Sequence, residues 1–278
     1  MKKINRRSFL AAAGLTAAAL ALTACGGSAS STASSTASSA ASSEAASTSA
    51  AAELTTVEAG KLTMATNAAF PPYEMTTDAG EFEGIDIDTA KAIAEKLGLE
   101  LQIDDMDFDA ALLSVQQGKA DIVMAGVTVT DERKAVMDFS DSYATGIQSI
   151  IVPEGSDITS PDDLAGKKIG TQRGTTGYIY CSDDFGDDAV VAYDDGLTAV
   201  QALNNGQVDA VVIDNAPAKE FVAANPGLVI LDTSYAEEDY AIGLAKGSAL
   251  EDAVNAALEE LKADGTLQSI VDRYITAD

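Results

Sequence analysis

From residue 54 onward, short apolar runs alternate with longer segments whose apolar residues recur every three or four positions. The short runs predict strands, and the longer segments predict helices. Strands separated by helical segments of about 10–15 residues are typical of βαβ units, so we predict an α/β fold with mostly parallel sheets. The predicted strands are 61–65, 99–103, 121–125, 168–171, 190–193, 208–213, 228–231 and 241–245. The predicted helices are 88–97, 108–117, 176–180, 196–204, 216–224, 250–263 and 266–274.

One sequence pattern occurs twice and suggests two similar lobes. Residues 113–124 and 202–212 each contain a helix end, a glycine where positive φ is needed, an aspartate and a buried strand. Gly118 and Gly206 lie 88 positions apart, a spacing that two lobes of about 90 residues would produce. The alternative is that a helix, a glycine and a strand follow one another by chance, since this succession is common in α/β proteins.

The boundaries of the two lobes follow from two extended segments, 147–152 and 240–245. We predict that lobe 1 comprises 54–143 plus 242–278 and that lobe 2 comprises 148–237. The crossing segments would lie near 144–147 and 238–241. The carboxyl ends of the strands in two such lobes would face a shared cleft, which is where open sheets bind ligands.

The first 53 residues predict export. Residues 1–24 contain four basic and no acidic side chains, and their apolar stretch is shorter than a membrane span, as in a signal peptide. Leu22-Thr-Ala-Cys25 resembles the lipobox of bacterial lipoprotein precursors, which implies a lipid anchor at Cys25 on the outer face of the cell membrane; a fortuitous Cys is the alternative. Residues 6–10 resemble a twin-arginine export signal. The Ser/Ala-rich segment 25–53 predicts a flexible tether.

Composition excludes several classes of function. The chain has 44 acidic and 17 basic residues, and four of the basic ones lie within 1–24. The exported part would therefore carry a charge near −31 and would repel nucleic acid and anionic lipid. The absence of histidine removes the Ser-His-Asp and Cys-His arrangements and the usual zinc ligand sets. Cys181 would be the only thiol besides Cys25, so no internal disulfide is available. We expect no cofactor or metal, and a monomer.

The first candidate binding group follows the predicted strand 121–125. Arg133 lies in the first turn of a helix capped by Thr130, where the helix dipole disfavours a cation, so an anionic ligand would explain it. A guanidinium binds a carboxylate in charge-assisted pairs. The Gly126 carbonyl and the Thr128 hydroxyl would accept from an ammonium group. A surface arginine paired with a neighbouring acid is the alternative.

Two further groups follow strands later in the chain. Residues 170–177 form a Gly/Thr-rich turn into a helix, whose free N–H groups suit a small carboxylate. This turn lacks the ending of a phosphate loop, and an ordinary capped turn is its alternative. Asp214 follows a buried strand and needs a cation or several donors. Taken alone, it reads better as the cap of the helix at Ala216. The Phe70 and Phe108 rings would cover an aliphatic ligand chain, or else lie in the core.

These groups belong to a longer succession of motifs. In order they are Asn67-Ala-Ala-Phe-Pro-Pro-Tyr-Glu, Gly84-Ile-Asp-Ile-Asp, Met106-Asp-Phe, Ala125-Gly-Val-Thr-Val-Thr-Asp-Glu-Arg, Asp138-Phe-Ser-Asp, Gly174-Thr-Thr-Gly, Val208-Asp-Ala-Val-Val-Ile-Asp and Ala263-Asp-Gly-Thr. The succession closely resembles the family 3 extracellular solute-binding proteins, including the glutamine- and histidine-binding types. The resemblance covers residues 61–274.

The resemblance implies a type II periplasmic-binding-protein fold, in which two α/β lobes close on a free amino acid that is passed to an ABC permease. It implies that Arg133 and Thr176 hold the α-carboxylate. It also implies that Asp214, Gly126 and Thr128 hold the α-ammonium. In the same way, Phe70 and Phe108 would flank the ligand side chain, with Asn67 and Gln172 near its far end.

Relatives that bind cationic side chains tend to have an acid where this chain has Asn67, so we expect a neutral polar ligand, although Glu74 could also reach the pocket.

Two alternative functions stay open. Cyclohexadienyl dehydratases resemble the same family, and aspartate and glutamate alone can perform acid–base chemistry. The absence of histidine and of an evident buried pair of acids argues against such an enzyme. A ligand-sensing module would need a separate chain to transmit a signal.

Overall fold

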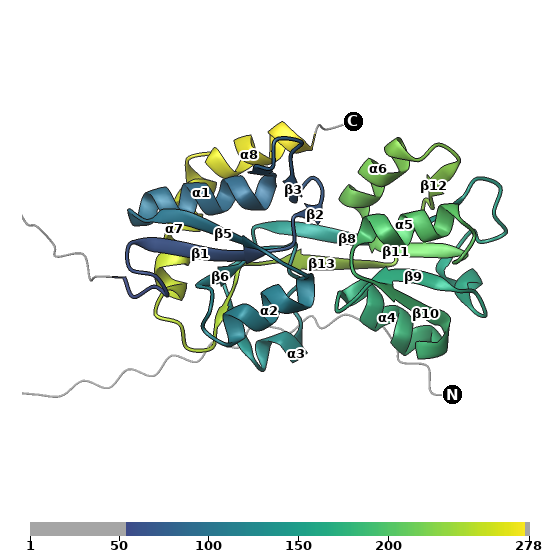
Figure 1. Ribbon diagram of the computed structural model, residues 1–278, viewed down its shortest axis with the longest axis horizontal. Helices are drawn as coiled ribbons and strands as arrows, with labels where there is room; N and C mark the ends of the chain where they lie inside the picture. Colours follow the sequence, from purple (N-terminus) through teal and green to yellow (C-terminus); the bar gives the residue numbers. More distant parts are fainter. Residues whose placement is uncertain (1–53, 276–278) are drawn as a thin grey trace, which may run out of the picture. The chain divides into compact units, whose positions relative to one another are not determined.

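The computed structural model describes residues 54–275, which form two mixed β-sheets flanked by helices, with a small third sheet (Figure 1). The predicted signal peptide, the tether and Cys25 lie outside the described residues. Within the described residues, no helix combines the length and the apolar character that a membrane span requires.

The first sheet has the strand order β5-β1-β6-β14-β7. Its strands are β1 (Lys61–Thr66), β5 (Glu100–Asp105), β6 (Ile122–Val123), β7 (Met137–Phe139) and β14 (Gly243–Ala245). The helices of this part are α1 (Ile85–Leu97), α2 (Phe108–Gln116), α3 (Asp131–Lys134), α7 (Glu251–Ala263) and α8 (Thr266–Tyr274). Helix α1 packs against α7 and α8, and α2 packs against β1, β6 and β14. This sheet therefore joins strands from both ends of the described chain.

The second sheet has the strand order β10-β9-β11-β8-β12, with β13 paired to β8. Its strands are β8 (Ala144–Pro153), β9 (Ile169–Gln172), β10 (Val190–Tyr193), β11 (Ala210–Asp214), β12 (Leu228–Ile230) and β13 (Ala236–Tyr240). Its helices are α4 (Thr176–Phe185), α5 (Gly196–Asn204) and α6 (Asn215–Ala224), with short 3-10 turns at Pro161–Leu164 and Asp187–Ala189. The small third sheet contains β2 (Ala69–Phe70), β3 (Glu74–Thr76) and β4 (Phe82–Glu83).

The pairing of the strands differs from the mostly parallel sheets that we predicted. β1 pairs in parallel with β5 and β6, and β9 pairs in parallel with β10 and β11. The remaining pairs in the two large sheets are antiparallel, because β8, β12, β13 and β14 are not joined to their neighbours through βαβ units. The alternation of strands and helices could not reveal these pairings.

The repeated helix–glycine–aspartate unit has the same local structure in both sheets. Gly118 and Gly206 both have φ of 66°, the left-handed conformation that ends the preceding helix. The Asp121 carboxylate accepts from the Thr63 N–H at 2.8 Å, and the Asp209 carboxylate accepts from the Lys168 N–H at 2.8 Å. Each aspartate thus fixes the start of the neighbouring strand.

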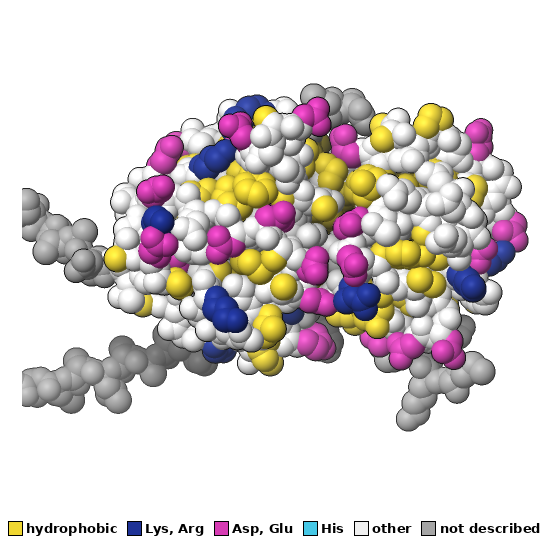
Figure 2. Space-filling view, in the orientation of Figure 1, with side chains coloured by type: hydrophobic (Ala, Val, Ile, Leu, Met, Phe, Trp, Pro, Cys, Tyr) yellow, Lys and Arg dark blue, Asp and Glu magenta, His cyan; other side chains and the backbone are white. Residues whose placement is uncertain are grey.

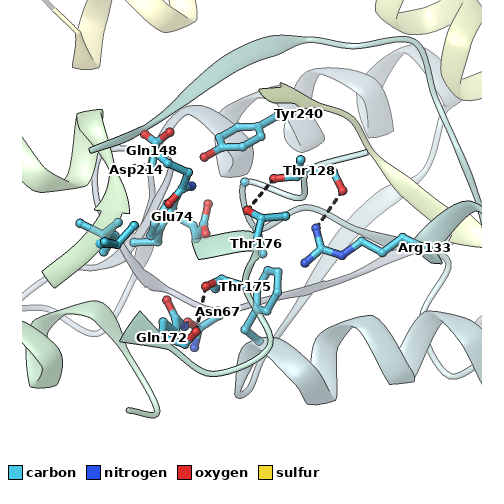
Figure 3. A pocket seen from close by; sticks show the side chains of 16 residues that line it. Asn67, Glu74, Thr128, Arg133, Gln148, Gln172, Thr175, Thr176, Asp214 and Tyr240 are labelled. Carbon is cyan, nitrogen blue, oxygen red and sulfur yellow. Dashed lines mark hydrogen bonds between the residues drawn. The ribbon is translucent and has the colours of Figure 1, made fainter. Parts of the chain in front are cut away.

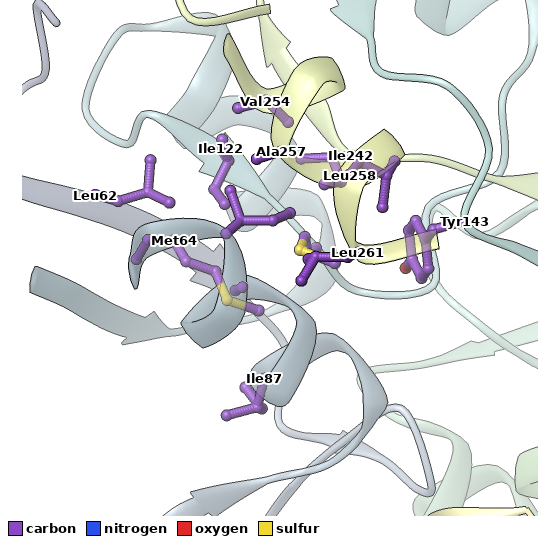
Figure 4. Close-up of a cluster of buried hydrophobic side chains, with 14 of the residues drawn as sticks. Leu62, Met64, Ile87, Ile122, Tyr143, Ile242, Val254, Ala257, Leu258 and Leu261 are labelled. Carbon is purple, nitrogen blue, oxygen red and sulfur yellow. The ribbon is translucent and has the colours of Figure 1, made fainter. Parts of the chain in front are cut away.

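The first sheet and its helices enclose a core of aliphatic side chains (Figure 4). Met64 from β1, Ile122 from β6 and Leu258 from α7 are fully buried there. Each such side chain contributes about 1.5–3 kcal/mol through burial. Separate clusters lie on the other face of this sheet and on both faces of the second sheet. Packing on both faces makes each sheet a rigid support for the loops at its strand ends.

The segments that we predicted to cross between lobes are paired strands. β13 pairs with the first half of β8, in a register that places Glu238 opposite Gly146 and Tyr240 opposite Ala144. A Cβ atom built on Gly146 would lie 2.5 Å from the Tyr240 ring, so glycine is the residue that lets the ring lie flat on this strand. The boundaries that we assigned to the two lobes stay a prediction.

We predict that Gly146→Ala lowers the free energy of unfolding by about 1–3 kcal/mol, because the added methyl group overpacks the Tyr240 ring. Urea denaturation of the purified protein measures the change. Thr145→Ala, at an exposed neighbouring position, is the control and should change the stability by less than about 0.5 kcal/mol. Equal stability of Gly146→Ala and the wild type would contradict the packing described.

Candidate functional site

The carboxyl ends of β1, β6, β9 and β11 meet at one cavity (Figure 3). All nine side chains or backbone segments that we predicted to bind a ligand lie in its wall. They are Asn67, Phe70, Phe108, Gly126, Thr128, Arg133, Gln172, Thr176 and Asp214. The sequence therefore identified residues that the fold brings together, although they are up to about 150 positions apart in the chain.

Arg133 is buried at one side of the cavity and is held by backbone carbonyl groups. Its Nη1 donates to the Thr128 carbonyl at 2.8 Å, and its Nη2 donates to the Gly174 carbonyl at 3.1 Å. The guanidinium also lies over the Phe108 ring, 5.4 Å from its centre. Burial lowers the pKa of Arg133, but a guanidinium stays charged at neutral pH. The cavity wall thus carries one fixed positive charge with N–H groups left for a ligand.

The helix that carries Arg133 differs from our expectation in one respect. Thr130 caps it as predicted, accepting from the Arg133 N–H at 3.1 Å. However, α3 has only four residues, which is about one turn, so Arg133 is near both of its ends. The helix dipole therefore gives no reason to place an anion there, and the argument for a ligand rests on the burial of Arg133 beside the cavity.

Asp214 is buried on the opposite side of the cavity from Arg133 in Figure 3. Its Oδ1 accepts from the Ala216 N–H at 3.0 Å, and its Oδ2 accepts from the Ile147 N–H at 2.7 Å. The first contact is the helix cap that the sequence favoured, and the same carboxylate also lines the cavity. Burial raises the pKa of Asp214 to about 6, so the group is mostly charged at pH 7. The Tyr240 hydroxyl also hydrogen-bonds this carboxylate, which leaves part of its acceptor capacity for a ligand cation.

Glu74 and Asp86 form a buried pair of acids next to the cavity. Both side chains are fully buried, and Glu74 lies in the cavity wall. Burial and the nearby Asp86 raise the pKa of Glu74 well above its ordinary value, so Glu74 is the member of the pair that keeps a proton. Asp86 also accepts from the Gly126 N–H at 3.0 Å. The pair thus carries one negative charge, and Glu74 is a neutral part of the wall.

This acid pair corrects one step of the sequence analysis. The absence of a buried pair of acids counted there against an enzyme, and that statement is wrong because Glu74 and Asp86 are such a pair. Only Glu74 reaches the cavity, while Asp86 lies behind it and fixes the Gly126 backbone. The pair therefore supports the wall of the cavity instead of presenting two carboxyl groups to a substrate.

Two amide side chains, Asn67 and Gln172, form the lower end of the cavity in Figure 3. Gln172 Nε2 donates to the Asn67 Oδ1 at 2.8 Å and to the Asp194 carbonyl at 3.2 Å. Asn67 Nδ2 donates to the Met106 carbonyl at 3.0 Å. Both hydrogens of the Gln172 amide are therefore used within the protein, and its carbonyl oxygen is the group left to face a ligand.

The turn before α4 brings backbone N–H groups to the cavity. Gly174 has φ of 73°, and Thr175 caps the helix by accepting from the Tyr178 N–H at 3.3 Å. α4 then begins at Thr176, which lies in the cavity wall and is buried. The alternative of an ordinary capped turn thus describes the backbone correctly. The cavity at its end is what makes this helix start a candidate site.

Aromatic rings cover the remaining wall. Phe108 begins α2, and Phe70 stacks on Tyr73 with the ring centres 5.7 Å apart. Phe70 also packs against the cores of both large sheets, so the core alternative holds for part of this ring. Tyr240 from β13 contacts Tyr73 edge-on at 5.4 Å. The rings give the cavity an apolar surface between its charged ends.

Three polar side chains of the wall were not assigned a role from the sequence: Gln148, Thr175 and Tyr240. Gln148 and Tyr240 belong to the paired strands β8 and β13, whose contact with the cavity depends on long-range pairing. Thr175 could have been recognised, because a threonine directly before a helix is a common cap.

Other features of the described residues place no second kind of chemistry in the molecule. Residues 54–275 contain no group of three or more Cys, Asp or Glu side chains placed to hold a metal ion. Cys181 is buried, and burial raises its pKa to about 12, so its thiol is unreactive. On the face in Figure 2, Asp and Glu are spread over both halves, and Lys and Arg occur mainly as single groups.

Residues 62–277 match the family described as bacterial extracellular solute-binding proteins, family 3. The chain belongs to this family. It is 32% identical to the probable histidine-binding protein of Neisseria gonorrhoeae over 99% of the chain and 98% of that protein.

Solved structures of similar proteins share the type II fold with its two lobes. The arginine-, lysine-, histidine-binding protein ArtJ of Geobacillus stearothermophilus has a TM-score of 0.75 and 34% identity, covering 78% of the chain and 96% of ArtJ. An ancestral arginine-binding protein bound to glutamine has a TM-score of 0.75 and 42% identity, with coverage of 78% and 99%. These proteins are solute-binding proteins, so the family assignment of the sequence analysis is confirmed.

We predict that the stability of the protein falls between pH 5 and pH 8 partly because of Glu74. The folded state keeps the Glu74 proton at a pH where the unfolded chain has lost it, so this contribution is full at low pH and declines as the pH rises. Glu74→Gln preserves the hydrogen-bond donor without titrating, and should reduce the decline by about 1–3 kcal/mol.

Urea denaturation at several pH values between 5 and 8 measures this effect. Glu81→Gln, an exposed position nearby, is the control and should keep the pH dependence of the wild type. The same decline in Glu74→Gln and the wild type would show that Glu74 does not hold a proton in the folded state.

Proposed function

We propose that the protein binds one free amino acid in this cavity and delivers it to an ABC-type importer. The observation that carries the proposal is the separation of two opposite buried charges, Arg133 and Asp214, on opposite sides of one cavity. A zwitterion has the matching pair of charges. The names of the relatives, which include histidine- and arginine-binding proteins, support an amino acid as the ligand class.

In this proposal, Arg133 and the N-terminus of α4 hold the α-carboxylate. Two N–H groups of the guanidinium bind the Thr128 and Gly174 carbonyls and fix its plane, which leaves its other N–H groups for the ligand. The backbone at Thr176 adds N–H groups from the start of a helix. Charge-assisted bonds of this kind are stronger than neutral ones.

The α-ammonium is held by Asp214, the Gly126 carbonyl and the Thr128 hydroxyl. Two backbone N–H groups and the Tyr240 hydroxyl bind Asp214 and fix its orientation, and the carboxylate keeps one acceptor position for the ammonium. Asp86 fixes the backbone at Gly126 through its N–H. A Cβ atom on Gly126 would lie 2.8 Å from the Phe70 ring, so glycine is also needed for the ring to close over this end.

The ligand side chain would lie between Phe70 and Phe108 and end at Asn67 and Gln172. The Gln172 amide hydrogens are already bound, so its oxygen is left as an acceptor, while Asn67 Nδ2 gives one hydrogen to Met106 and keeps one. A carboxamide, which has both donors and an acceptor, fits such an end better than a carboxylate. We propose a neutral polar side chain, such as a carboxamide, as the preferred ligand.

Ligand binding would favour the closed arrangement of the two lobes. Arg133 and Thr128 come from the part around the first sheet, and Asp214 and Thr176 come from the second sheet and its helices. A ligand that contacts both sets binds the closed state better than an open one, and this difference in affinity shifts the equilibrium. The closed form would dock on the permease as a monomer, held at the outer face of the membrane by a lipid anchor at Cys25, and would perform no catalysis.

We predict that Arg133→Ala weakens amino-acid binding by about 2–4 kcal/mol, because the buried α-carboxylate loses its charged partner. Isothermal titration calorimetry with the best-binding amino acid measures the loss. Arg273→Ala removes an exposed arginine on α8 and is the matched control, with affinity equal to the wild type. Unchanged affinity in Arg133→Ala would remove Arg133 from the site.

We predict that the protein binds L-glutamine more tightly than L-glutamate by about 100-fold or more, because a side-chain carboxylate would face the Gln172 oxygen and leave this acceptor unpaired. A calorimetric screen of the standard amino acids, cystine and ornithine measures the order of affinities. Tightest binding of arginine or lysine, with no binding of glutamine, would overturn the neutral ligand and leave the amino-acid class in place.

A further inference from the structure

Glu238 lies behind the cavity on β13, at a position that the sequence analysis did not single out. The strand alternates, so that Glu237 and Asp239 are exposed while Glu238 is only 6% exposed. A buried carboxylate is costly unless it is paired and hydrogen-bonded. The contacts of Glu238 therefore show which groups of the site depend on it.

One oxygen of Glu238 accepts three hydrogen bonds from residues of the cavity wall. The Thr128 hydroxyl donates to Oε2 at 3.1 Å, the Thr176 hydroxyl donates at 3.0 Å and Gln148 Nε2 donates at 3.0 Å. The charge of Glu238 also stabilises the buried guanidinium of Arg133. The three donors come from a loop beside the first sheet, from α4 and from β8, so a single atom joins three separate segments.

These bonds decide what the two threonines can offer to a ligand. A hydroxyl group has one hydrogen. The two hydroxyl oxygens lie 3.4 Å apart and either could donate to the other, but the contacts with the Glu238 carboxylate are shorter and charge-assisted, so we assign both hydrogens to Glu238. Thr128 and Thr176 line the cavity, so towards a ligand their hydroxyl oxygens can act only as acceptors. An ammonium group needs acceptors, whereas a carboxylate needs donors. In the absence of Glu238, each hydroxyl could rotate and donate elsewhere.

We propose that Glu238 is a positioning residue for the ligand ammonium, which fixes the Thr128 and Thr176 hydroxyl groups as acceptors and links the two sides of the cavity. The inference rests on the proposed function, since it concerns the ammonium end of the same site. In this inference, the backbone N–H groups at the start of α4 bind the α-carboxylate, and the Thr176 hydroxyl does not. The effect of Glu238 is then independent of the ligand side chain.

The test compares Glu238→Gln with the wild type in calorimetric titrations with L-glutamine and L-arginine at pH 7. Glutamine at position 238 keeps the shape of the side chain and removes its charge. We expect both affinities to fall by about tenfold or more, with the ratio between them unchanged, because a hydrogen-bonded charge has been lost at the shared end of the ligand. Glu237→Gln, which alters the exposed neighbour, should bind as the wild type does.

A second arm separates positioning from a general structural effect. In a Thr128→Val, Thr176→Val background, the same Glu238→Gln change should cost less than about threefold, because the two hydroxyl groups that Glu238 positions are gone and only its contacts with Gln148 and Arg133 remain. An affinity within threefold of the wild type in Glu238→Gln, or an equal loss in both backgrounds, would overturn the proposal. If Glu238→Gln does not fold, Thr128→Val alone should bind about tenfold more weakly, and unchanged affinity there would overturn it.

The outcome for the wild type distinguishes this inference from the proposed function. Binding by the wild type with no effect of the Glu238 variants would refute the role of Glu238 and leave amino-acid binding in place. Absence of binding of any amino acid in the wild type would refute the proposed function, and the role of Glu238 would fall with it.

Discussion

Charges buried at the junction of the two sheets must be balanced by the protein itself, and this constraint shapes the site. Arg133, Asp214 and Glu238 are each at least nine-tenths buried. Burial of an unpaired charge costs several kcal/mol, so each has backbone or side-chain partners: carbonyl groups for the guanidinium, N–H groups for Asp214, and hydroxyl and amide groups for Glu238. The partners come from loops, helix starts and β8, so the charges hold together the segments that surround the cavity.

Local sequence patterns located part of the cavity wall, and the resemblance to the solute-binding family added Asn67 and Gln172. Arg133 and Asp214 were found because each follows a short buried strand, and ligand sites of α/β proteins form at such strand ends. The prediction did not need the directions in which the strands pair, which it gave wrongly as mostly parallel. The strand ends that carry the site still lie side by side, because β1 is parallel to its neighbour β6 and β9 is parallel to its neighbour β11.

Residues whose burial depends on distant partners could not be predicted in the same way. Glu238 lies in an acidic run that is typical of an exposed segment, and only its pairing with β8 opposite Gly146 turns it inward. Asp86 lies in the first turn of α1, where an acid is favourable even in water, so its contact with Glu74 left no local signal. Few site residues were predicted in the crossing segments, because β8 and β13 are far apart in the sequence and only their pairing shows which side chains turn inward.

The pairing of β13 with β8 limits how the two lobes can move. β8 is one continuous strand of ten residues, bonded to β13 in its first half and to β11 and β12 in its second half. A displacement of one lobe against the other must therefore bend a two-stranded ribbon, and cannot pivot freely about two loose linkers. Such a ribbon resists shear within its plane and yields more easily to twisting and to bending out of that plane. In the closure that we propose, the lobes would therefore move in few directions, limited by hydrogen bonds that lie outside the cavity wall.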